Sequence, residues 1–205
     1  LTSPSLSSND AAGDSYLAVE EFYGSTFADT MVGNGSDNQL LGGNGNDTLF
    51  GAAGDDWLDG GLGNDVIRGG AQTTADGVFF RDATAGVVVN LSIITAQNTV
   101  GSGIDTIVNI EKVEGSRFGD RLTGSSVDNL VSGLDGNDVL DGAAGDDWLF
   151  GGEGNDTLIG GTHFAGDGVS YFKATTGVRV SLTLTAAQNT LGAGIDTLSG
   201  IEFLE

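Results

Sequence analysis

A nine-residue repeat is the feature that most constrains how this chain can fold. Residues 42–68 read GGNGNDTLF, GAAGDDWLD and GGLGNDVIR, and residues 133–159 read GLDGNDVLD, GAAGDDWLF and GGEGNDTLI. The shared template has glycine at positions 1, 2 and 4, an acid at position 6 and an apolar residue at position 8. Such a short fixed period predicts a stack of similar units, each contacting mainly its neighbours.

Each repeat supplies one turn and one short strand. Positions 7 to 9 are expected to form the strand and positions 1 to 6 the turn, so that two repeats complete one coil. Alternation along the strand directs position 8 inward. We therefore predict an all-β, right-handed parallel β-roll or β-helix with little helix, because no segment shows a capped helical period. The inward row is Leu49, Leu58, Ile67, Leu140, Leu149 and Leu158.

The turns have the composition of a calcium site. Glycine tolerates positive φ and leaves its carbonyl unshielded, and the position-6 carboxylate lies beside such carbonyls. Same-side turns stack about 4.8 Å apart, so a cation between them would meet oxygens from both. Calcium prefers about six to eight oxygens, whereas zinc prefers Cys or His, and the chain has no Cys and only His163.

The predicted calcium ligands form three groups. The carboxylates are those of Asp29, Asp47, Asp56, Asp65, Asp76, Asp120, Asp138, Asp147, Asp156 and Asp167. The carbonyls are those of Gly43, Gly45, Gly54, Gly61, Gly63, Gly136, Gly145, Gly152 and Gly154. Weaker candidates are Asn38, Asn129, Asp105 and Asp196. The last two lie in GSGIDTIV and GAGIDTLSG, which recover the pattern G-x-G-x-D with Ile107 and Leu198 in the inward place.

These repeats resemble the RTX (repeats-in-toxin) or haemolysin-type calcium-binding family. The resemblance implies parallel β-rolls that bind calcium, found in large adhesins and secreted enzymes. It also implies a secreted or cell-surface location reached by type I secretion, with a C-terminal export signal expected beyond residue 205.

A longer period contains the short one. Trp57 and Trp148 are 91 residues apart, and AQNTVGSGIDTIVNIE from residue 96 matches AQNTLGAGIDTLSGIE from residue 187. We therefore predict tandem modules in a fragment of a longer repetitive protein. The expected segments are 1–23 (the tail of a preceding module), 24–114 (roll 24–77, strand-rich 78–114) and 115–205 (roll 115–168, strand-rich 169–205).

Less regular repeats, which we call the weaker repeats, precede each of the two blocks at 42–68 and 133–159. We call the six repeats of these two blocks the good repeats. GSTFADTMV and GNGSDNQLL fill residues 24–41, and GSRFGDRLT and GSSVDNLVS fill residues 115–132. They keep the apolar position 8, but Asn38 and Asn129 replace the acid and should bind calcium more weakly. After the good repeats, two extra residues precede Asp76 and Asp167. The β-branched stretches GVVVNLSII and GVRVSLTLT then predict longer strands, as hairpins laid on or extending the roll.

Charge limits the possible partners. The chain has 29 acids and 7 bases, giving a net charge of −22, so nucleic acid and anionic membranes are poor partners. One apolar side chain per repeat makes a thin core, and bound metal must then supply much of the folding free energy. About four calcium ions per module, or about eight in all, would leave about six negative charges. The lack of Cys suits a secreted, metal-stabilised protein, and there is no membrane-spanning run.

Other chemistry has weaker support. The neighbouring acids Asp55–Asp56 and Asp146–Asp147 resemble a glycosidase pair, but the repeat explains them better: position 6 faces metal and position 5 faces solvent. His163 is interpreted as an exposed loop residue, and one His assembles no catalytic triad. Trp57 and Trp148 at position 7 face outward, where they would either be covered by the strand-rich segments or stack on sugars.

The preferred function is a calcium-binding structural module, folding on exposure to extracellular calcium and acting as a spacer, without enzymatic activity in this fragment. Its expected partners are calcium, the neighbouring repeats of the parent chain, and a cell surface or polysaccharide. The alternative is a parallel β-helix carbohydrate-active enzyme or a glycan-binding module.

Overall fold

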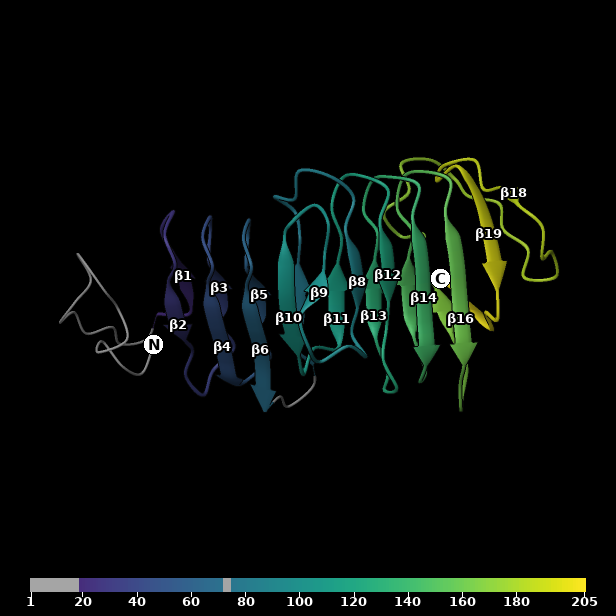
Figure 1. Cartoon of the computed structure of the whole chain (residues 1–205). Helices are drawn as coiled ribbons and strands as arrows, with labels where there is room; N and C mark the ends of the chain where they lie inside the picture. Colours follow the sequence, from purple (N-terminus) through teal and green to yellow (C-terminus); the bar gives the residue numbers. More distant parts are fainter. Residues whose placement is uncertain (1–18, 72–74) are drawn as a thin grey trace. The chain divides into compact units, whose positions relative to one another are not determined.

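The computed structural model describes residues 19–71 and 75–205, and these residues contain strands and turns but no helix (Figure 1). The strands of the first half are β1 (Glu21–Tyr23), β2 (Thr30–Val32), β3 (Gln39–Leu41), β4 (Thr48–Ala53), β5 (Trp57–Asp59), β6 (Val66–Ala71), β7 (Gly77–Phe79), β8 (Val88–Asn90), β9 (Gln97–Asn98) and β10 (Ile104–Val108). Those of the second half are β11 (Lys112–Glu114), β12 (Arg121–Thr123), β13 (Leu130–Ser132), β14 (Val139–Ala144), β15 (Trp148–Phe150), β16 (Thr157–Thr162), β17 (Gly168–Val169), β18 (Gln188–Asn189), β19 (Ile195–Ser199) and β20 (Phe203–Leu204).

The chain forms two compact units. The first contains the described residues up to Ala83 together with Ile93–Ile110, and the second contains Thr84–Ser92 and Glu111–Glu205. In the first unit the parallel strands β1, β3, β5 and β7 lie on one side of the coil, in that order. The parallel strands β2, β4, β6 and β10 lie on the other side, and β9 pairs antiparallel with β10.

The second unit repeats this arrangement. Strands β11, β13, β15, β17 and β20 form one parallel sheet. The other sheet has the order β8, β12, β14, β16, β19 and β18, in which β18 alone is antiparallel to its neighbour. Strand β8 therefore forms the edge of this sheet although it precedes β9 and β10 in sequence.

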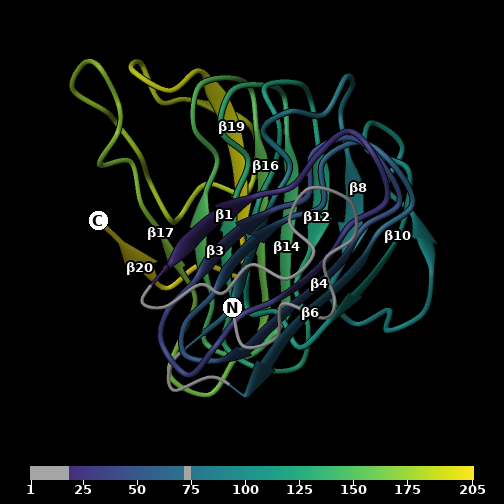
Figure 2. The ribbon, with the colours of Figure 1, turned by 90° about the vertical axis from the view of Figure 1, so that its left-hand side faces the viewer.

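The strand register follows the nonapeptide. Met31 lies beside Leu49, and Leu49 lies beside Ile67, a spacing of two repeats. Figure 2 shows the successive turns of the first unit nested behind one another. The register lengthens by two residues where Leu58 meets Val78, as the insertion before Asp76 predicts. The parallel coil of nonapeptides is thus confirmed.

Position 8 forms the core of each unit. Each of these side chains is at most 3% exposed, and most are completely buried, because alternation points them between the two sheets. In the first unit they are Met31, Leu40, Leu49, Leu58, Ile67 and Ile107. In the second they are Leu122, Val131, Leu140, Leu149, Leu158 and Leu198.

Strand and hairpin segments accompany the roll as predicted, but the strands expected in the β-branched stretches are shorter than predicted. GVVVNLSII contributes only the three residues of β8, and GVRVSLTLT forms no strand, only an isolated bridge between Val178 and Leu191. Two short antiparallel pairs, β9 with β10 and β18 with β19, are present instead. High β-propensity does not make a strand where no neighbouring backbone pairs with it.

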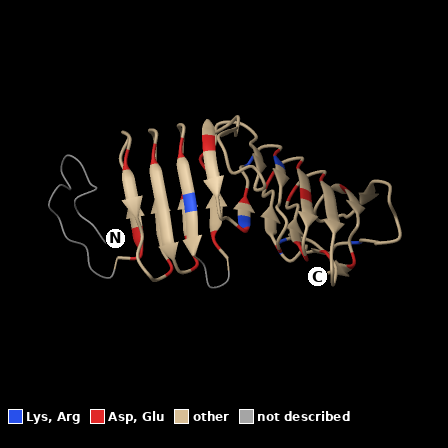
Figure 3. Cartoon of the chain, turned by 60° about the horizontal axis from the view of Figure 1, so that its bottom comes forward, with Lys and Arg blue, Asp and Glu red and all other residues tan. Residues whose placement is uncertain are grey.

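The charge lies mainly in the turns. Figure 3 shows red acidic segments at strand ends and few blue basic ones. None of the described segments is a helix of the length and apolarity needed to cross a membrane.

Candidate metal centre

The position-6 side chains stack into columns along each unit. The backbone N–H of each position-6 residue donates to Oδ1 of the position-6 acid one coil further on. Asp29 donates to Asp47 and Asp47 to Asp65, both at 2.8 Å, and on the other side Asn38 donates to Asp56 at 2.7 Å. The second unit does the same, for example from Asp120 to Asp138 at 2.8 Å. One oxygen of each stacked carboxylate therefore has a structural role.

The second oxygen of these carboxylates is exceptional. In all six good repeats Oδ2 is buried with no hydrogen-bond donor, and the residues are Asp47, Asp56, Asp65, Asp138, Asp147 and Asp156. A buried polar atom without a partner is unfavourable by about 1–3 kcal/mol, and more when it is charged. Repeated at the same position, such atoms indicate a cation site.

A backbone carbonyl of the next coil lies close to four of these oxygens, those of Asp47, Asp56, Asp138 and Asp147. A Cβ added to Gly42 would lie 2.4 Å from Asp47 Oδ2 and 2.6 Å from the carbonyl oxygen of Gly60, one coil further on. A Cβ added to Gly142 would likewise lie 2.4 Å from Asp147 Oδ2 and 2.5 Å from Gly160 O. The carboxylate oxygen and the carbonyl oxygen are both hydrogen-bond acceptors, and no donor lies between them. Hard oxygen ligands of this kind suit calcium.

Position 2 sets up this arrangement through its backbone. In the good repeats φ at position 2 is positive, as at Gly43 (+99°) and Gly61 (+82°), even where the residue is Ala52 (+89°), Leu134 (+75°) or Ala143 (+73°). The glycines predicted to offer carbonyls all have positive φ, namely Gly43, Gly45, Gly54, Gly61, Gly63, Gly136, Gly145, Gly152 and Gly154. In this conformation no position-2 N–H reaches the acid of its own repeat.

The weaker repeats behave differently at position 2. There the position-2 N–H donates to the position-6 side chain of the same repeat: Ser25 to Asp29 Oδ2 and Ser116 to Asp120 Oδ2, both at 2.6 Å. The asparagine repeats do likewise, with Asn34 donating to Asn38 at 2.7 Å and Ser125 to Asn129 at 2.6 Å. In these four repeats, the oxygen that the good repeats leave without a donor already has one.

Two further acids extend the columns, as their G-x-G-x-D pattern predicts. The N–H of Asp65 donates to Asp105 Oδ1 at 2.9 Å, and that of Asp156 to Asp196 Oδ1 at 3.0 Å. Their second oxygens accept from hydroxyl groups: Thr99 for Asp105, and Thr190 and Tyr171 for Asp196. Asp105 and Asp196 therefore resemble the weaker repeats, in which the second oxygen has a donor, more than the good repeats.

The acids after the insertions also join the columns. Asp76 Oδ1 accepts from the N–H of Asp56, and Asp167 Oδ1 from that of Asp147, both at 2.8 Å. Asp167 Oδ2 lies 3.3 Å from Nδ1 of His163, which is also 3.2 Å from Glu202 Oε2. His163 is thus a neighbour of the last acid in its column, a contact that the sequence did not predict.

Burial perturbs the titration of the columns. It raises the pKa of Asp56 and Asp156 to about 6, and that of Asp65, Asp138 and Asp147 to about 7. Neighbouring acids of the same column raise the pKa values further, because like charges disfavour ionisation. Before a cation binds, the columns therefore hold protons more tightly than free carboxyl groups do.

Position 5 has a role that the sequence analysis missed. Its side chain accepts the position-5 N–H one coil further on, as Asn46 accepts from Asn64 and Asn137 from Asn155, at 2.9 and 2.8 Å. Asp146, predicted simply to face solvent, is half-buried and accepts N–H bonds from Phe164, Ala165 and Gly166. The signal was present, because position 5 is Asn or Asp in every good repeat.

The tryptophans are partly covered. A Cβ at Gly77 would lie 2.5 Å from the Trp57 ring, and Phe79 packs at 5.6 Å between ring centroids. Gly168 contacts Trp148 in the same way, and Trp148 stays 38% exposed. The glycine on the neighbouring strand therefore lies against each indole.

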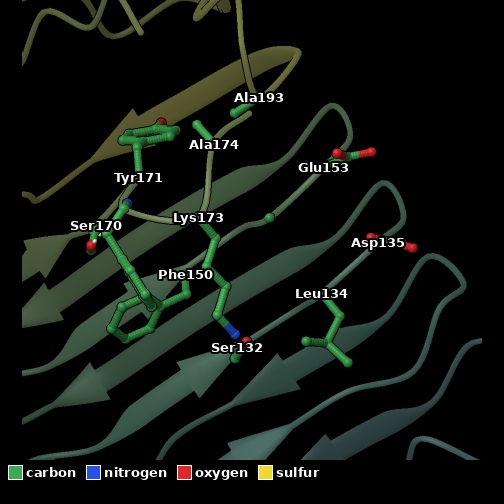
Figure 4. Close-up of a pocket in the computed structure, with 12 residues that line it drawn as sticks. Ser132, Leu134, Asp135, Phe150, Glu153, Ser170, Tyr171, Lys173, Ala174 and Ala193 are labelled. Atoms are coloured by element: carbon green, nitrogen blue, oxygen red, sulfur yellow. Dashed lines mark hydrogen bonds between the residues drawn. The ribbon is translucent and has the colours of Figure 1, made fainter. Parts of the chain in front are cut away.

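A cavity of about 170 Å³ lies in the second unit (Figure 4). Phe150, Tyr171, Phe172 and Lys173 line it together with acids from the adjacent turns. Phe150 and Phe172 meet edge to face at 6.0 Å, and the Tyr171 hydroxyl donates to Asp196 at 3.1 Å. The cavity is smaller than the 300–1,000 Å³ typical of small-molecule sites.

Comparison with known proteins identifies the repeats. The family description "RTX calcium-binding nonapeptide repeat" matches four times, over residues 23–58, 41–73, 114–149 and 132–162. These ranges contain the donor-free carboxylates of all six good repeats. Residues 23–73 and 114–162 are therefore RTX calcium-binding nonapeptide repeats, and these repeats form a calcium-binding structural module of a kind typical of secreted proteins. No curated protein matches the chain.

Proposed function

We propose that calcium binding drives the folding of this chain, which then acts as a rigid spacer in a larger secreted protein. The observation that carries the proposal is the stack of buried carboxylate oxygens without donors, four of which share their space with a backbone carbonyl of the next coil. A net charge of −22 and one core side chain per repeat leave the metal-free coil poorly stabilised.

The proposed ligands are the position-6 acids of the good repeats with the glycine-rich turns stacked beside them. Asp76 and Asp167 complete the set, which then offers about four sites per module. At Asp167 the calcium ion would replace the 3.3 Å contact between Oδ2 and Nδ1 of His163. Asp29, Asp120, Asn38, Asn129, Asp105 and Asp196 are assigned a structural role instead, because their second oxygen already accepts a hydrogen bond.

Calcium concentration then determines where the chain folds. Extracellular calcium modules bind at about 10⁻⁴–10⁻³ M. At far lower cytosolic calcium the chain would stay unfolded, a state suited to export by type I secretion. Outside the cell the filled columns would fix the turns and hold the coil straight.

Circular dichroism tests this proposal. Metal-stripped protein in EDTA should lack β-structure, and millimolar calcium should restore it cooperatively. Magnesium at the same concentration should be much less effective, because it keeps its waters and requires tight octahedral geometry. The same β spectrum with and without calcium would contradict the proposal.

The aromatic cavity favours glycan binding as a second candidate function. Phe172 is 65% exposed at its rim, and Lys173 Nζ lies 5.7 Å from the centre of that ring. Sugar rings stack on exposed aromatic faces of this kind. Binding to a polysaccharide array in calcium, lost in Phe172→Ala and kept in the exposed control Phe164→Ala, would support this function. Absence of binding by the wild-type chain would exclude it.

A further inference from the structure

The second unit brings the single histidine of the chain against two carboxylates. Nδ1 of His163 lies 3.3 Å from Oδ2 of Asp167 and 3.2 Å from Oε2 of Glu202. These three atoms all lie within 4.8 Å of one another. Gln72 stands at the equivalent place 91 residues earlier, so the first module offers no imidazole there. We call His163, Asp167 and Glu202 the histidine cluster.

Backbone hydrogen bonds hold the histidine cluster in place. Glu202 Oε2 accepts the N–H of Asp167 at 2.9 Å, and the N–H of Glu202 donates to the carbonyl of Asp167 at the same distance. Strands β17 and β20, which follow Asp167 and Glu202 directly, are paired neighbours (Figure 2). The turn that carries His163 is fixed as well, because Asp146 accepts the N–H groups of residues 164–166. All of these contacts lie inside one sequence module, so none depends on the residues that precede or follow it.

The spacing of the histidine cluster suits metal ligands better than a hydrogen-bonded ion pair. A charge-assisted N–H···O bond is typically about 2.7–2.9 Å long, and the two distances from His163 Nδ1 are both longer. Around a tetrahedral zinc ion with bonds of about 2.0–2.1 Å, neighbouring ligand atoms lie about 3.3 Å apart. The observed 3.2 and 3.3 Å match that separation. The imidazole nitrogen and both carboxylate oxygens can therefore face a single ion.

Asp167 places a buried charge at the centre of this cluster. Its side chain is fully buried. A Cβ added to Gly160 would lie 2.5 Å from Asp167 Oδ2 and would collide with the carbonyl oxygen of Gly200, so these two acceptors share one small space. A buried carboxylate beside another acceptor is unfavourable unless a cation compensates its charge.

We propose that the histidine cluster binds zinc or a neighbouring divalent transition ion through His163 Nδ1, Asp167 Oδ2 and Glu202 Oε2, with water as the fourth ligand. Imidazole suits zinc and its neighbours in the transition series, whereas calcium prefers oxygen ligands. Calcium must displace His163 from Asp167, but a zinc ion retains the imidazole as a ligand. Zinc and calcium therefore compete for Asp167, and bound zinc ties the turn after β16 to the segment that enters β20.

This site goes beyond calcium-driven folding and rests on it only in that calcium folds the second unit. Circular dichroism in EDTA and in calcium tests the folding proposal by itself. If the chain proves folded without calcium, that proposal fails, and the zinc experiments are run unchanged in calcium-free buffer. The two proposals therefore fail in different measurements.

Histidine NMR tests the site directly, because the chain has one imidazole. The tag-free chain, labelled with ¹⁵N-histidine and folded in millimolar calcium, is titrated with zinc chloride in a buffer that does not chelate zinc. We expect the Nδ1 resonance of His163 to shift and to saturate at a single zinc ion per chain. Magnesium added at the same concentrations should leave it unshifted, because magnesium prefers oxygen ligands and keeps its waters. Zinc titration that leaves the imidazole resonances unchanged would overturn the proposal.

Matched variants separate the cluster from general binding to carboxylates, with zinc affinity measured by calorimetry in the same calcium buffer. His163→Gln, which introduces the residue of the first module, should weaken zinc binding at least about tenfold, since even outer-shell partners of a metal contribute about 10–100-fold. Glu202→Gln should do the same while keeping an oxygen for the N–H of Asp167. Glu153→Gln removes an exposed acid of the same unit outside the cluster and should bind zinc as the wild type does.

The folding of these variants is checked by circular dichroism in calcium. His163→Gln should still fold, so that its loss of zinc affinity reports the missing ligand. Glu202→Gln provides an independent test of the same site from a different strand. Absence of saturable zinc binding by the wild type, or wild-type zinc affinity in both His163→Gln and Glu202→Gln, would overturn the proposal.

Discussion

Replacing Asp47 by asparagine should stabilise the calcium-free coil and weaken its response to calcium. The substitution keeps an oxygen that can accept the N–H of Asp29, now bonded to Oδ1 at 2.8 Å. It replaces Oδ2, which is buried without a donor beside the carbonyl of Gly60, by an amide group that can donate there. The two effects have opposite signs, and no simple loss of packing would produce both.

The magnitudes follow from the contacts. Removing an unsatisfied buried acceptor is worth about 1–3 kcal/mol, so the metal-free fold should gain about 1 kcal/mol after relaxation. Loss of a charged ligand should cost the calcium-bound fold about 1.5–3 kcal/mol, which corresponds to roughly ten- to hundredfold in affinity. The slope of unfolding free energy against the logarithm of calcium concentration reports the number of ions bound. In Asp47→Asn this slope should fall by an amount that corresponds to about one calcium ion.

The assay is urea unfolding at a series of free calcium concentrations, with an excluded osmolyte added where the metal-free chain must be folded. Asp29→Asn is the matched control. Asparagine fits that geometry, because Asn38 accepts the corresponding N–H at 2.7 Å in the next repeat. The control should lower stability slightly at every calcium concentration and leave the slope unchanged. An unchanged slope in Asp47→Asn, or equal slope losses in both variants, would refute the reasoning.

Three other predictions follow from particular contacts. Folded carboxyls with pKa values of about 6 to 7 hold protons that unfolded ones release near pH 4, so lowering the pH from 8 to 5 should stabilise the metal-stripped coil, measured by its urea midpoint in the same osmolyte. Ala143 adopts φ +73°, so Ala143→Gly should raise the thermal midpoint by relieving about 1–2 kcal/mol, whereas Ala144→Gly should lower it. Gly77→Ala would place a Cβ 2.5 Å from the Trp57 ring, so it should destabilise the calcium-loaded unit and shift its tryptophan emission to the red, whereas the exposed control Gly35→Ala should do neither.

The coil could be predicted from the sequence because a fixed period of nine residues determines how successive strands stack. Position 8 had to be apolar for two sheets to meet, and Leu49, Leu58 and Ile67 are buried as predicted. Asp105 and Asp196 were assigned to the columns from the G-x-G-x-D pattern alone, although about 40 residues separate each from its neighbour in the stack. The repeat pattern can still be recognised after such an inserted segment, because glycine, aspartate and the apolar residue resume the same relative positions beyond it.

The sequence could not predict which oxygens lack a donor. Asp29 and Asp47 occupy the same place in the template, yet Ser25 donates to Asp29 and no such donor reaches Asp47. The difference depends on the φ angle at position 2, which residue type only biases: Ala52 and Leu134 adopt the glycine conformation. The fate of GVRVSLTLT was likewise beyond the sequence, because strand formation depends on a neighbouring backbone as well as on propensity.

A weak repeat should become a calcium site if position 2, position 4 and position 6 are changed together. The space beside Asn129 already has the required carbonyl, since a Cβ at Gly124 would lie 2.3 Å from Gly142 O and 2.5 Å from Asn129 Oδ1. The N–H of Ser125 already donates a hydrogen bond to Asn129 Oδ1 at 2.6 Å. Asn129→Asp alone should therefore add charge without adding an ion, because that N–H remains in place. The triple variant Ser125→Gly/Val127→Gly/Asn129→Asp lets the turn adopt the positive φ of the good repeats, and it should steepen the calcium dependence of stability by about one ion. Equal steepening by the single variant would show that the acid alone defines a site and that the conformation of position 2 does not.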